Sequence, residues 1–116
     1  MSKYDVNKFK QVTVALNTPF QPDGSVDLKA VRAVVNYFYN KGIRQMYVCG
    51  STGEGFLLDA QERMAVTETV VEEAAGRMNI IVHVGCPDTR HSEELARHAE
   101  KAGADATSAV PCVYYR

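Results

Sequence analysis

The sequence of 116 residues predicts an α/β fold built on a parallel β-sheet. Short apolar runs alternate with stretches of helical period, and the alternation recurs about every thirty residues, the length of a strand–helix–strand unit. The apolar runs show no polar alternation, which is typical of strands buried on both faces. This pattern leaves open whether the sheet is open and doubly wound or closed into a barrel.

The first unit begins with an apolar run at residues 12–16. We expect this strand to stop at residues 17–19, where a proline cannot continue a ladder. Residues 22–24 have the composition of a turn. Asp27 is then a predicted helix N-cap, and Gly42 marks the end of that helix. The apolar face of the helix contains Leu28, Val31, Val35 and Phe38.

The second unit repeats this plan. Residues 45–49 predict a strand, and residues 50–55 form a glycine-rich loop. Asp59 and Glu62 resemble a capping box in which Asp replaces the usual Ser or Thr. The helix that follows is predicted to end near Gly76. Its apolar stripe contains Val66, Val70 and Ala74.

The third unit has its strand in the apolar run at residues 80–84. Thr89 is the predicted cap of the next helix, which Gly103 closes. The buried face of this helix is expected to contain Leu95, Ala99 and Ala102. Residues 107–110 then begin a fourth strand. No linker or charge block interrupts the chain, so residues 1–116 are predicted to belong to one domain.

Charge and composition exclude several classes of partner. A formal net charge of -1 and a pI near 6.3 argue against nucleic acid or an anionic membrane surface as the main partner. The longest apolar runs have the length of strands, which is too short for a helix that spans a bilayer. The first eleven residues lack the apolar core of a secretory signal. Three cysteines provide no disulfide framework, so we expect a cytoplasmic protein.

The glycine-rich loop is the first candidate for a binding site, because ligands of parallel α/β folds bind at the carboxyl ends of the strands. It contains Ser51 and Thr52 between glycines, so that backbone N–H groups can converge on a small anion such as a carboxylate. The loop has neither the lysine of a phosphate-binding loop nor the dinucleotide pattern, which disfavours a nucleotide. A simple connecting turn explains the same residues equally well.

Two further groups of residues could have a chemical role. The tyrosine pair that follows the fourth strand could relay a proton, although a phenol with a pKa of about 10 needs help from its neighbours and such pairs usually pack. Four potential zinc ligands fall near strand ends: Cys49, His83, Cys86 and Cys112. Their spacing contains no C-x-x-C pair, so we predict no metal site and expect buried thiols and a core histidine. Glu54 is expected to anchor the loop, and His91 and His98 to be solvated.

Four segments together resemble the pyruvate-dependent class I aldolase family, which contains N-acetylneuraminate lyase and dihydrodipicolinate synthase. They are residues 15–20 (ALNTPF), 50–54 (GSTGE), 83–86 (HVGC) and 109–115 (AVPCVYY). They occur in the family's order and at its spacing along the whole chain. Ser51, the pair at 55–56 and the segment at 83–86 look like the neuraminate lyase branch.

The resemblance implies a closed (β/α)8 TIM barrel, of which this chain covers about the first three and a half units. Residues 1–116 would then be the N-terminal part of a single barrel domain. The family's members are commonly homotetramers that use no metal or organic cofactor. They act on small molecules through a Schiff base between a lysine on a later strand and a keto acid.

The resemblance also assigns roles to residues of this chain. Ser51 and Thr52, with Gly50 and Gly53, would hold the carboxylate of pyruvate. Tyr115 would move the proton of the sugar-side hydroxyl while the carbon–carbon bond breaks, with Ser51 in a hydrogen-bonded relay. N-acetylneuraminate would yield N-acetylmannosamine and pyruvate.

The lysines depart from the family pattern, because none lies at the carboxyl end of a predicted strand. They are Lys3, Lys8, Lys10, Lys29, Lys41 and Lys101. We therefore expect the Schiff-base lysine to lie beyond residue 116, and the isolated 116-residue chain to be inactive. Dihydrodipicolinate synthase or another 2-keto acid aldolase is the alternative activity. A non-enzymatic half-barrel, which binds a carboxylate or pairs with a second copy, is the other alternative.

Overall fold

A computed structural model describes residues 5–111. Its sheet contains four parallel strands in chain order: β1 (Val14–Ala15), β2 (Gln45–Val48), β3 (Asn79–His83) and β4 (Ala106–Ser108). Three α-helices connect them: α1 (Leu28–Asn40), α2 (Ala60–Ala74) and α3 (Thr89–Ala102). Two short 3-10 helices complete the described chain: η1 (Val6–Phe9) and η2 (Gly55–Leu57). The alternation of strands and helices confirms the predicted α/β class.

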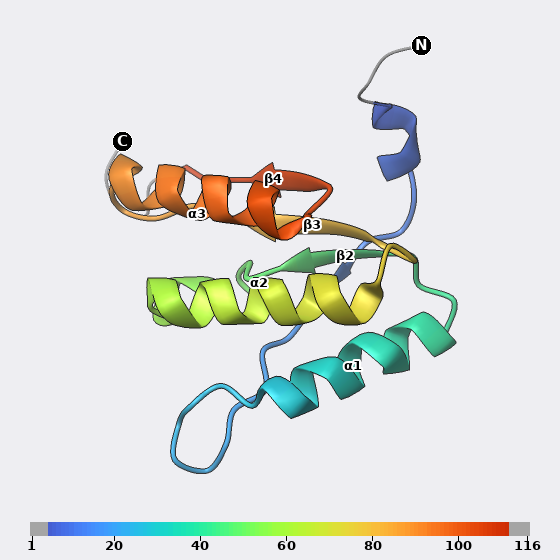
Figure 1. Ribbon diagram of the computed structural model, residues 1–116, viewed down its shortest axis with the longest axis horizontal. Helices are drawn as coiled ribbons and strands as arrows, with labels where there is room; N and C mark the ends of the chain where they lie inside the picture. The colour runs from blue at the N-terminus through green and yellow to red at the C-terminus, as the bar shows by residue number, and fades with distance from the viewer. Residues whose placement is uncertain (1–4, 112–116) are drawn as a thin grey trace.

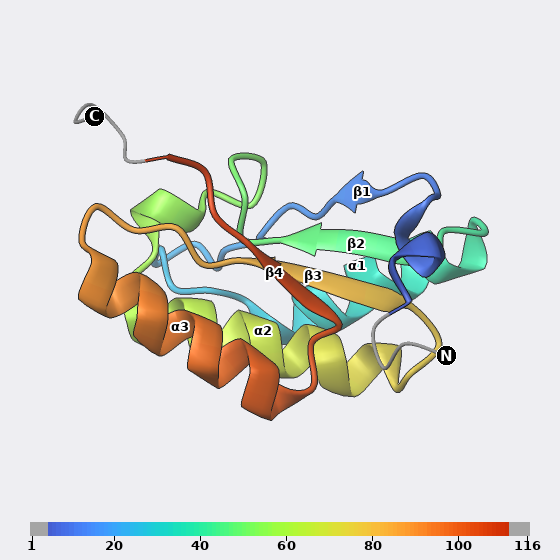
Figure 2. The ribbon, with the colours of Figure 1, turned by 90° about the horizontal axis from the view of Figure 1, so that it is seen from above.

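The three α-helices lie side by side on one face of the sheet (Figures 1 and 2). Between this face and the helices lies the core. Alternate residues of β2 and β3 are buried in this core. They are neighbours across the two strands, where Met46 pairs with Ile80 and Val48 pairs with Val82. The helices contribute the predicted apolar residues Val31, Val35, Val66, Val70, Ala74, Leu95 and Ala99. The helical periods read from the sequence are therefore confirmed as core-facing stripes.

Aspartate side chains begin all three α-helices. Asp27 accepts a hydrogen bond from the N–H of Ala30, and Asp59 forms the predicted capping box with Glu62. The cap of α3 is Asp88, which accepts from the N–H of His91, so the prediction of Thr89 was wrong by one residue. Both residue types can cap a helix, and the side chain that reaches the third helical N–H decides the boundary.

The bounds of the first and last strands and one residue of the α1 face differ from the sequence prediction. β1 is shorter than the apolar run, because Val12 is 74% exposed and lies outside the ladder. Leu28 is 37% exposed at the first turn of α1 and does not belong to its buried face. β4 ends at Ser108 rather than at residue 110. A short apolar run predicts that a strand is present more reliably than it predicts where the strand begins and ends.

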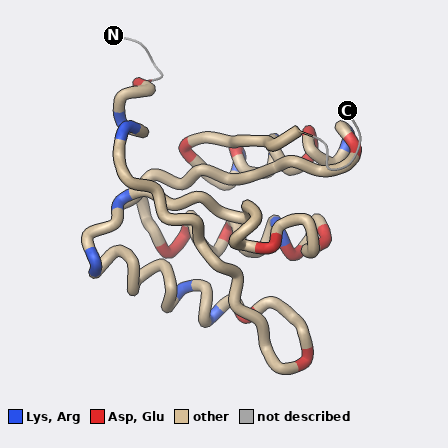
Figure 3. Tube along the Cα trace, turned by 180° about the vertical axis from the view of Figure 1, so that it is seen from behind, with Lys and Arg blue, Asp and Glu red and all other residues tan. Residues whose placement is uncertain are grey.

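The opposite face of the sheet carries no α-helix among residues 5–111, as Figure 2 shows. The short helix η1 lies at the amino ends of β2 and β3, to which side-chain hydrogen bonds join it. Gln45 donates a hydrogen bond to the carbonyl of Phe9, and Asn79 donates to that of Lys8. Charged residues lie on the helices and loops and are absent from the four strands (Figure 3). Within the described residues, no helix has the length and apolar character needed to cross a membrane.

Candidate active site at the carboxyl ends of the strands

The glycine-rich loop at residues 50–55 rises from the carboxyl end of β2 (Figure 2). Two backbone hydrogen bonds fold it: Glu54 N–H to Ser51 O and Gly55 N–H to Gly50 O, both 3.0 Å. Among residues 5–111, the N–H groups and hydroxyls of Ser51 and Thr52 have no hydrogen-bond partner, and both residues are exposed. These are the donors that a small anion requires.

The glycines of this loop allow backbone segments to approach closely. A Cβ atom at Gly55 would lie 1.9 Å from the carbonyl oxygen of Cys49, and one at Gly53 would lie 2.9 Å from that of Leu16. Thr18 adds a buried hydrogen bond of 2.7 Å from its hydroxyl to the carbonyl of Gly53. The loop is therefore packed against the ends of β1 and β2, which holds its free donors in a fixed place.

His83, the last residue of β3, lies behind the loop and is 2% exposed. Its Nδ1 is 2.9 Å from the carbonyl oxygen of Cys49, and the N–H of Val110 points at its Nε2 from 3.4 Å. The ring of Phe56 meets the imidazole edge-on at 5.3 Å between centroids. Burial lowers the pKa of His83, the hydrogen bond to Cys49 opposes this, and the charge of Arg63 lowers it further.

Sequence reasoning missed Arg63, which lies in α2 and is only 4% exposed. Its guanidinium donates to the carbonyls of His83 at 2.7 Å and Gly85 at 2.9 Å, and to the sulfur of Cys86 at 3.3 Å. Within the described chain no carboxylate pairs with it, and its Nε has no partner. One signal was available: residue 63 is in phase with the buried stripe that begins at Val66.

Among residues 5–111, no three His, Cys, Asp or Glu side chains are grouped as the ligands of a metal ion would be. Burial raises the pKa of the Cys49 thiol to about 11, which keeps it neutral near pH 7. Cys86 accepts a hydrogen bond from Arg63 through its sulfur. Cys112 lies outside the described residues.

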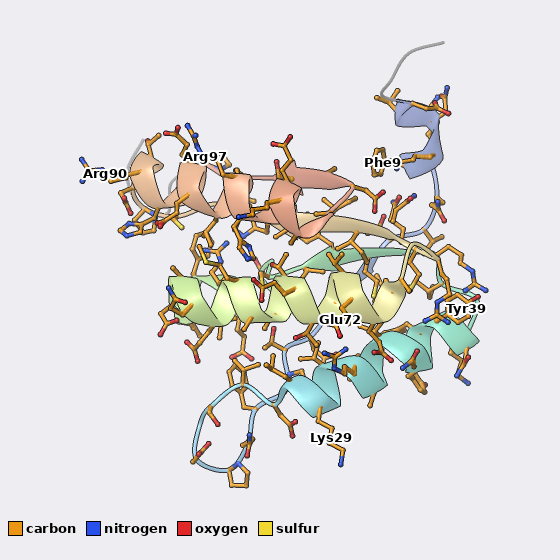
Figure 4. The ribbon with its side chains drawn as sticks, viewed as in Figure 1. Phe9, Lys29, Tyr39, Glu72, Arg90 and Arg97 are labelled. Atoms are coloured by element: carbon orange, nitrogen blue, oxygen red, sulfur yellow. The ribbon has the colours of Figure 1, made fainter. Side chains whose placement is uncertain are left out.

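Two expectations about charged side chains were wrong. Glu54 is exposed in a left-handed conformation at φ 58°, and its carboxylate makes no capping hydrogen bond to η2. His98 is half-buried between α2 and α3, where its Nε2 lies 2.7 Å from Glu68. His91 is exposed, and its Nδ1 is 2.8 Å from Asp88. The exposed surface of α3 is charged, with Arg90 and Arg97 projecting from it (Figure 4).

The predicted site residues Gly50, Ser51, Thr52 and Gly53 share one loop. Tyr115 lies outside the described residues, and Val110 is the part of its segment that reaches His83. The described lysines lie on helices or directly after them, none at the carboxyl end of a strand: Lys8, Lys10, Lys29, Lys41 and Lys101. Lys29, for example, projects outward from α1 (Figure 4).

Proteins of known name are similar in sequence to this chain over most of its length. The N-acetylneuraminate lyase of Mediterraneibacter gnavus is 37% identical over 111 residues, which are 96% of this chain and 35% of that protein. That of Escherichia coli is 44% identical over 104 residues, 90% of this chain and 35% of that protein. The chain thus spans about a third of the length of the curated relatives that it matches.

Solved structures agree with the sequence relatives. A catalytic lysine mutant of the Ruminococcus gnavus sialic acid aldolase matches with a TM-score of 0.93 and 36% identity, over 97% of this chain and 37% of that one. Dihydrodipicolinate synthase from Aquifex aeolicus matches with a TM-score of 0.84 and 36% identity, over 88% of this chain and 34% of that one. The parallel β/α arrangement is therefore that of the N-terminal part of their TIM barrels, as predicted.

The family model covers nearly the whole chain. It matches residues 8–116 and includes every segment that forms the candidate site. The glycine-rich loop, the buried histidine behind it and the fourth strand all fall within this match. The chain belongs to the dihydrodipicolinate synthetase family.

Proposed function

We propose that the protein is a class I aldolase that cleaves N-acetylneuraminate to N-acetylmannosamine and pyruvate. This chain would supply the loop that binds the pyruvate carboxylate and the tyrosine that transfers a proton. A strand-end lysine outside the described residues would form the Schiff base. The activity is proposed for the whole protein, because this chain spans only about a third of the length of its relatives.

The glycine-rich loop is the observation that carries the proposal. Ser51 and Thr52 present unused N–H groups and exposed hydroxyls at the carboxyl ends of the strands. The loop is held from behind by the Thr18 hydrogen bond to Gly53. A carboxylate bound there would fix the keto carbon relative to an incoming amine, and fixed orientation lowers the barrier to reaction. Gly50 and Gly53 would let the backbone close around the anion.

The proposed reaction balances without a metal or organic cofactor. The lysine amine condenses with the keto carbon of the substrate and releases water, which leaves an iminium. Tyr115, as phenolate, removes the proton of the sugar-side hydroxyl, with Ser51 as the relay. That oxygen becomes the aldehyde while the electrons of the breaking carbon–carbon bond move into the iminium and form an enamine. Protonation of the enamine and hydrolysis release pyruvate and restore the lysine.

The names of the sequence relatives favour N-acetylneuraminate over the alternative substrate of dihydrodipicolinate synthase. The test measures two rates with the same preparation: pyruvate release from N-acetylneuraminate, and condensation of pyruvate with aspartate semialdehyde. We expect the first reaction to dominate. If only the condensation proceeds, the substrate assignment is wrong and the aldolase assignment stands. If pyruvate binds and neither reaction proceeds, the non-enzymatic alternative of a carboxylate-binding module is favoured.

We also propose the setting in which the protein works. The substrate is a small molecule, and a net charge of -1 gives nucleic acid or an anionic membrane no strong attraction. The proposed location is the cytoplasm, and the proposed assembly is a homo-oligomer, a tetramer by resemblance to the family. Size-exclusion chromatography with light scattering checks the assembly.

A further inference from the structure

We infer that Tyr47 is a positioning residue that supports the glycine-rich loop, the proposed carboxylate-binding loop, from below. Its phenol ring packs against Gly50, the first residue of the loop. Its hydroxyl donates a hydrogen bond to Ser108 at the end of β4. The inference rests on the proposed function, because it assigns a support to the loop that would bind the pyruvate carboxylate.

The place of Tyr47 in β2 directs its side chain to the helix-free face of the sheet (Figure 2). Met46 and Val48 on either side of it are buried against the helices, and successive side chains of a strand point to opposite faces. From there the hydroxyl reaches across β3 to Ser108 of β4. Because helices form the outer ring of a TIM barrel, this is the inner face of the barrel, directly below the strand ends.

Contact between the ring and Gly50 determines where the loop begins. A Cβ atom at Gly50 would lie 2.5 Å from Cε1 and 2.7 Å from Cδ1 of Tyr47. The ring therefore fills the space into which any side chain at position 50 would project. The carbonyl of Gly50 also accepts the hydrogen bond from the N–H of Gly55 that closes the loop. A support under Gly50 thus acts on both ends of the loop.

The hydroxyl bond keeps the ring in this place. It joins Tyr47 to the half-buried Ser108 at 3.1 Å, and the carbonyl of Ser108 accepts in turn from the N–H of Val84 at 2.8 Å. The imidazole of His83 lies beside the phenol, with 6.2 Å between the ring centroids. Residues of β3 and β4 therefore fix the side chain of a β2 residue. Without the hydroxyl bond, the ring would be free to turn away from Gly50.

The support acts on binding of the carboxylate rather than on turnover. Ser51 and Thr52, with their unused N–H groups and hydroxyls, follow Gly50 directly, so a shift of Gly50 displaces these donors. Tyr47 has no part in the bond changes of the proposed reaction. Loss of its support weakens the hold on the carboxylate equally before and during the reaction, and such a loss raises KM with little change in kcat.

A double-mutant cycle in the whole protein tests the inference. Tyr47→Phe keeps the ring and removes the hydroxyl, Ser108→Ala removes the acceptor, and the double variant lacks both. Tyr37→Phe is the matched control, because it removes the same atom from a tyrosine that is 57% exposed on α1. Readouts are KM and kcat for cleavage of N-acetylneuraminate, the pyruvate concentration for half-maximal borohydride trapping, and the melting temperature.

We expect each single variant to raise KM and the half-maximal pyruvate concentration about 3–10-fold, the factor that one ordinary hydrogen bond supports. The value of kcat should change by less than about 2-fold. The double variant should match either single variant, because the same bond is lost only once. Tyr47→Leu, which lacks the ring as well, should raise KM further, and the control should keep wild-type values.

Three results would overturn the inference. The first is wild-type KM and pyruvate trapping in Tyr47→Phe. The second is a double variant whose loss is the sum of the two single losses, since Tyr47 and Ser108 would then act separately. The third is a fall in kcat at unchanged KM. If Tyr47→Leu does not fold, the cycle decides alone. A folded wild-type protein that traps no pyruvate contradicts the proposed function itself, and with it the inference.

Discussion

The substitution Gly55→Ala tests how closely the carboxylate-binding loop is packed. Its Cβ would lie 1.9 Å from the carbonyl oxygen of Cys49, so that oxygen must retreat by about 1.5 Å to reach an ordinary contact of 3.4 Å. Such a shift breaks the 2.9 Å hydrogen bond to His83. Overpacking costs about 1–3 kcal/mol, and an unsatisfied buried group costs about 1–3 kcal/mol. The free energy of unfolding should therefore fall by about 2–6 kcal/mol.

Gly42→Ala is the matched control for this prediction. Gly42 has a φ of +92° and nothing within 4 Å of the added Cβ, so its cost is that of the left-handed backbone alone, about 1–2 kcal/mol. Gly55 has no such positive φ, and its cost is steric. Urea denaturation followed by circular dichroism measures both variants. Equal or smaller destabilisation by Gly55→Ala would refute the close approach of the loop to Cys49.

Three further predictions concern the groups behind the loop. Arg63→Met should lower the free energy of unfolding by about 1–3 kcal/mol, because two buried carbonyls lose their donor, and NMR titration should find the pKa of His83 closer to its usual value. Because the pKa of His83 is lowered from 6.5 in the folded protein, the unfolded chain takes up the proton first. Stability from the neutral ring is complete above pH 6.5 and is lost as pH falls from 6.5 through the folded pKa. Chemical denaturation at stepped pH should show this loss in wild type and not in His83→Asn. Thr18→Val should cost about 1 kcal/mol through the lost bond to Gly53 and raise the KM for pyruvate. Ser25→Ala, which removes an exposed hydroxyl bond to Asp23 far from the loop, is the surface comparison and should leave the KM unchanged.

Local signals in the sequence were sufficient for most of the fold. Asp27 and the pair Asp59 and Glu62 satisfy N–H groups within the same helical turn, so adjacent residues determine the cap. The stripe that begins at Val66 has a helical period that needs no tertiary information. The error at Thr89 arose because two residues that can cap a helix stand side by side.

The candidate site was only partly predictable, because its supports come from distant parts of the chain. The sequence left open whether the glycine-rich loop binds an anion or only connects β2 to the next helix. Within residues 5–111 the N–H groups of Ser51 and Thr52 have no partner, and the proposed carboxylate site rests on this observation. The role of His83 depends on contacts with residues 34 and 27 positions away, which no local pattern encodes. Arg63 was overlooked because a guanidinium in an apolar stripe is rarely buried without a carboxylate.

An intact mass spectrum of the protein from its source cell, recorded before and after treatment with pyruvate and borohydride, tests the proposed Schiff base directly. We expect a gain of one reduced pyruvate per chain. Thr52→Ala should reach the same gain only at higher pyruvate concentrations, because it loses a donor of the carboxylate loop. A protein that is folded, yet gains no mass at any pyruvate concentration, would contradict the proposed Schiff-base aldolase.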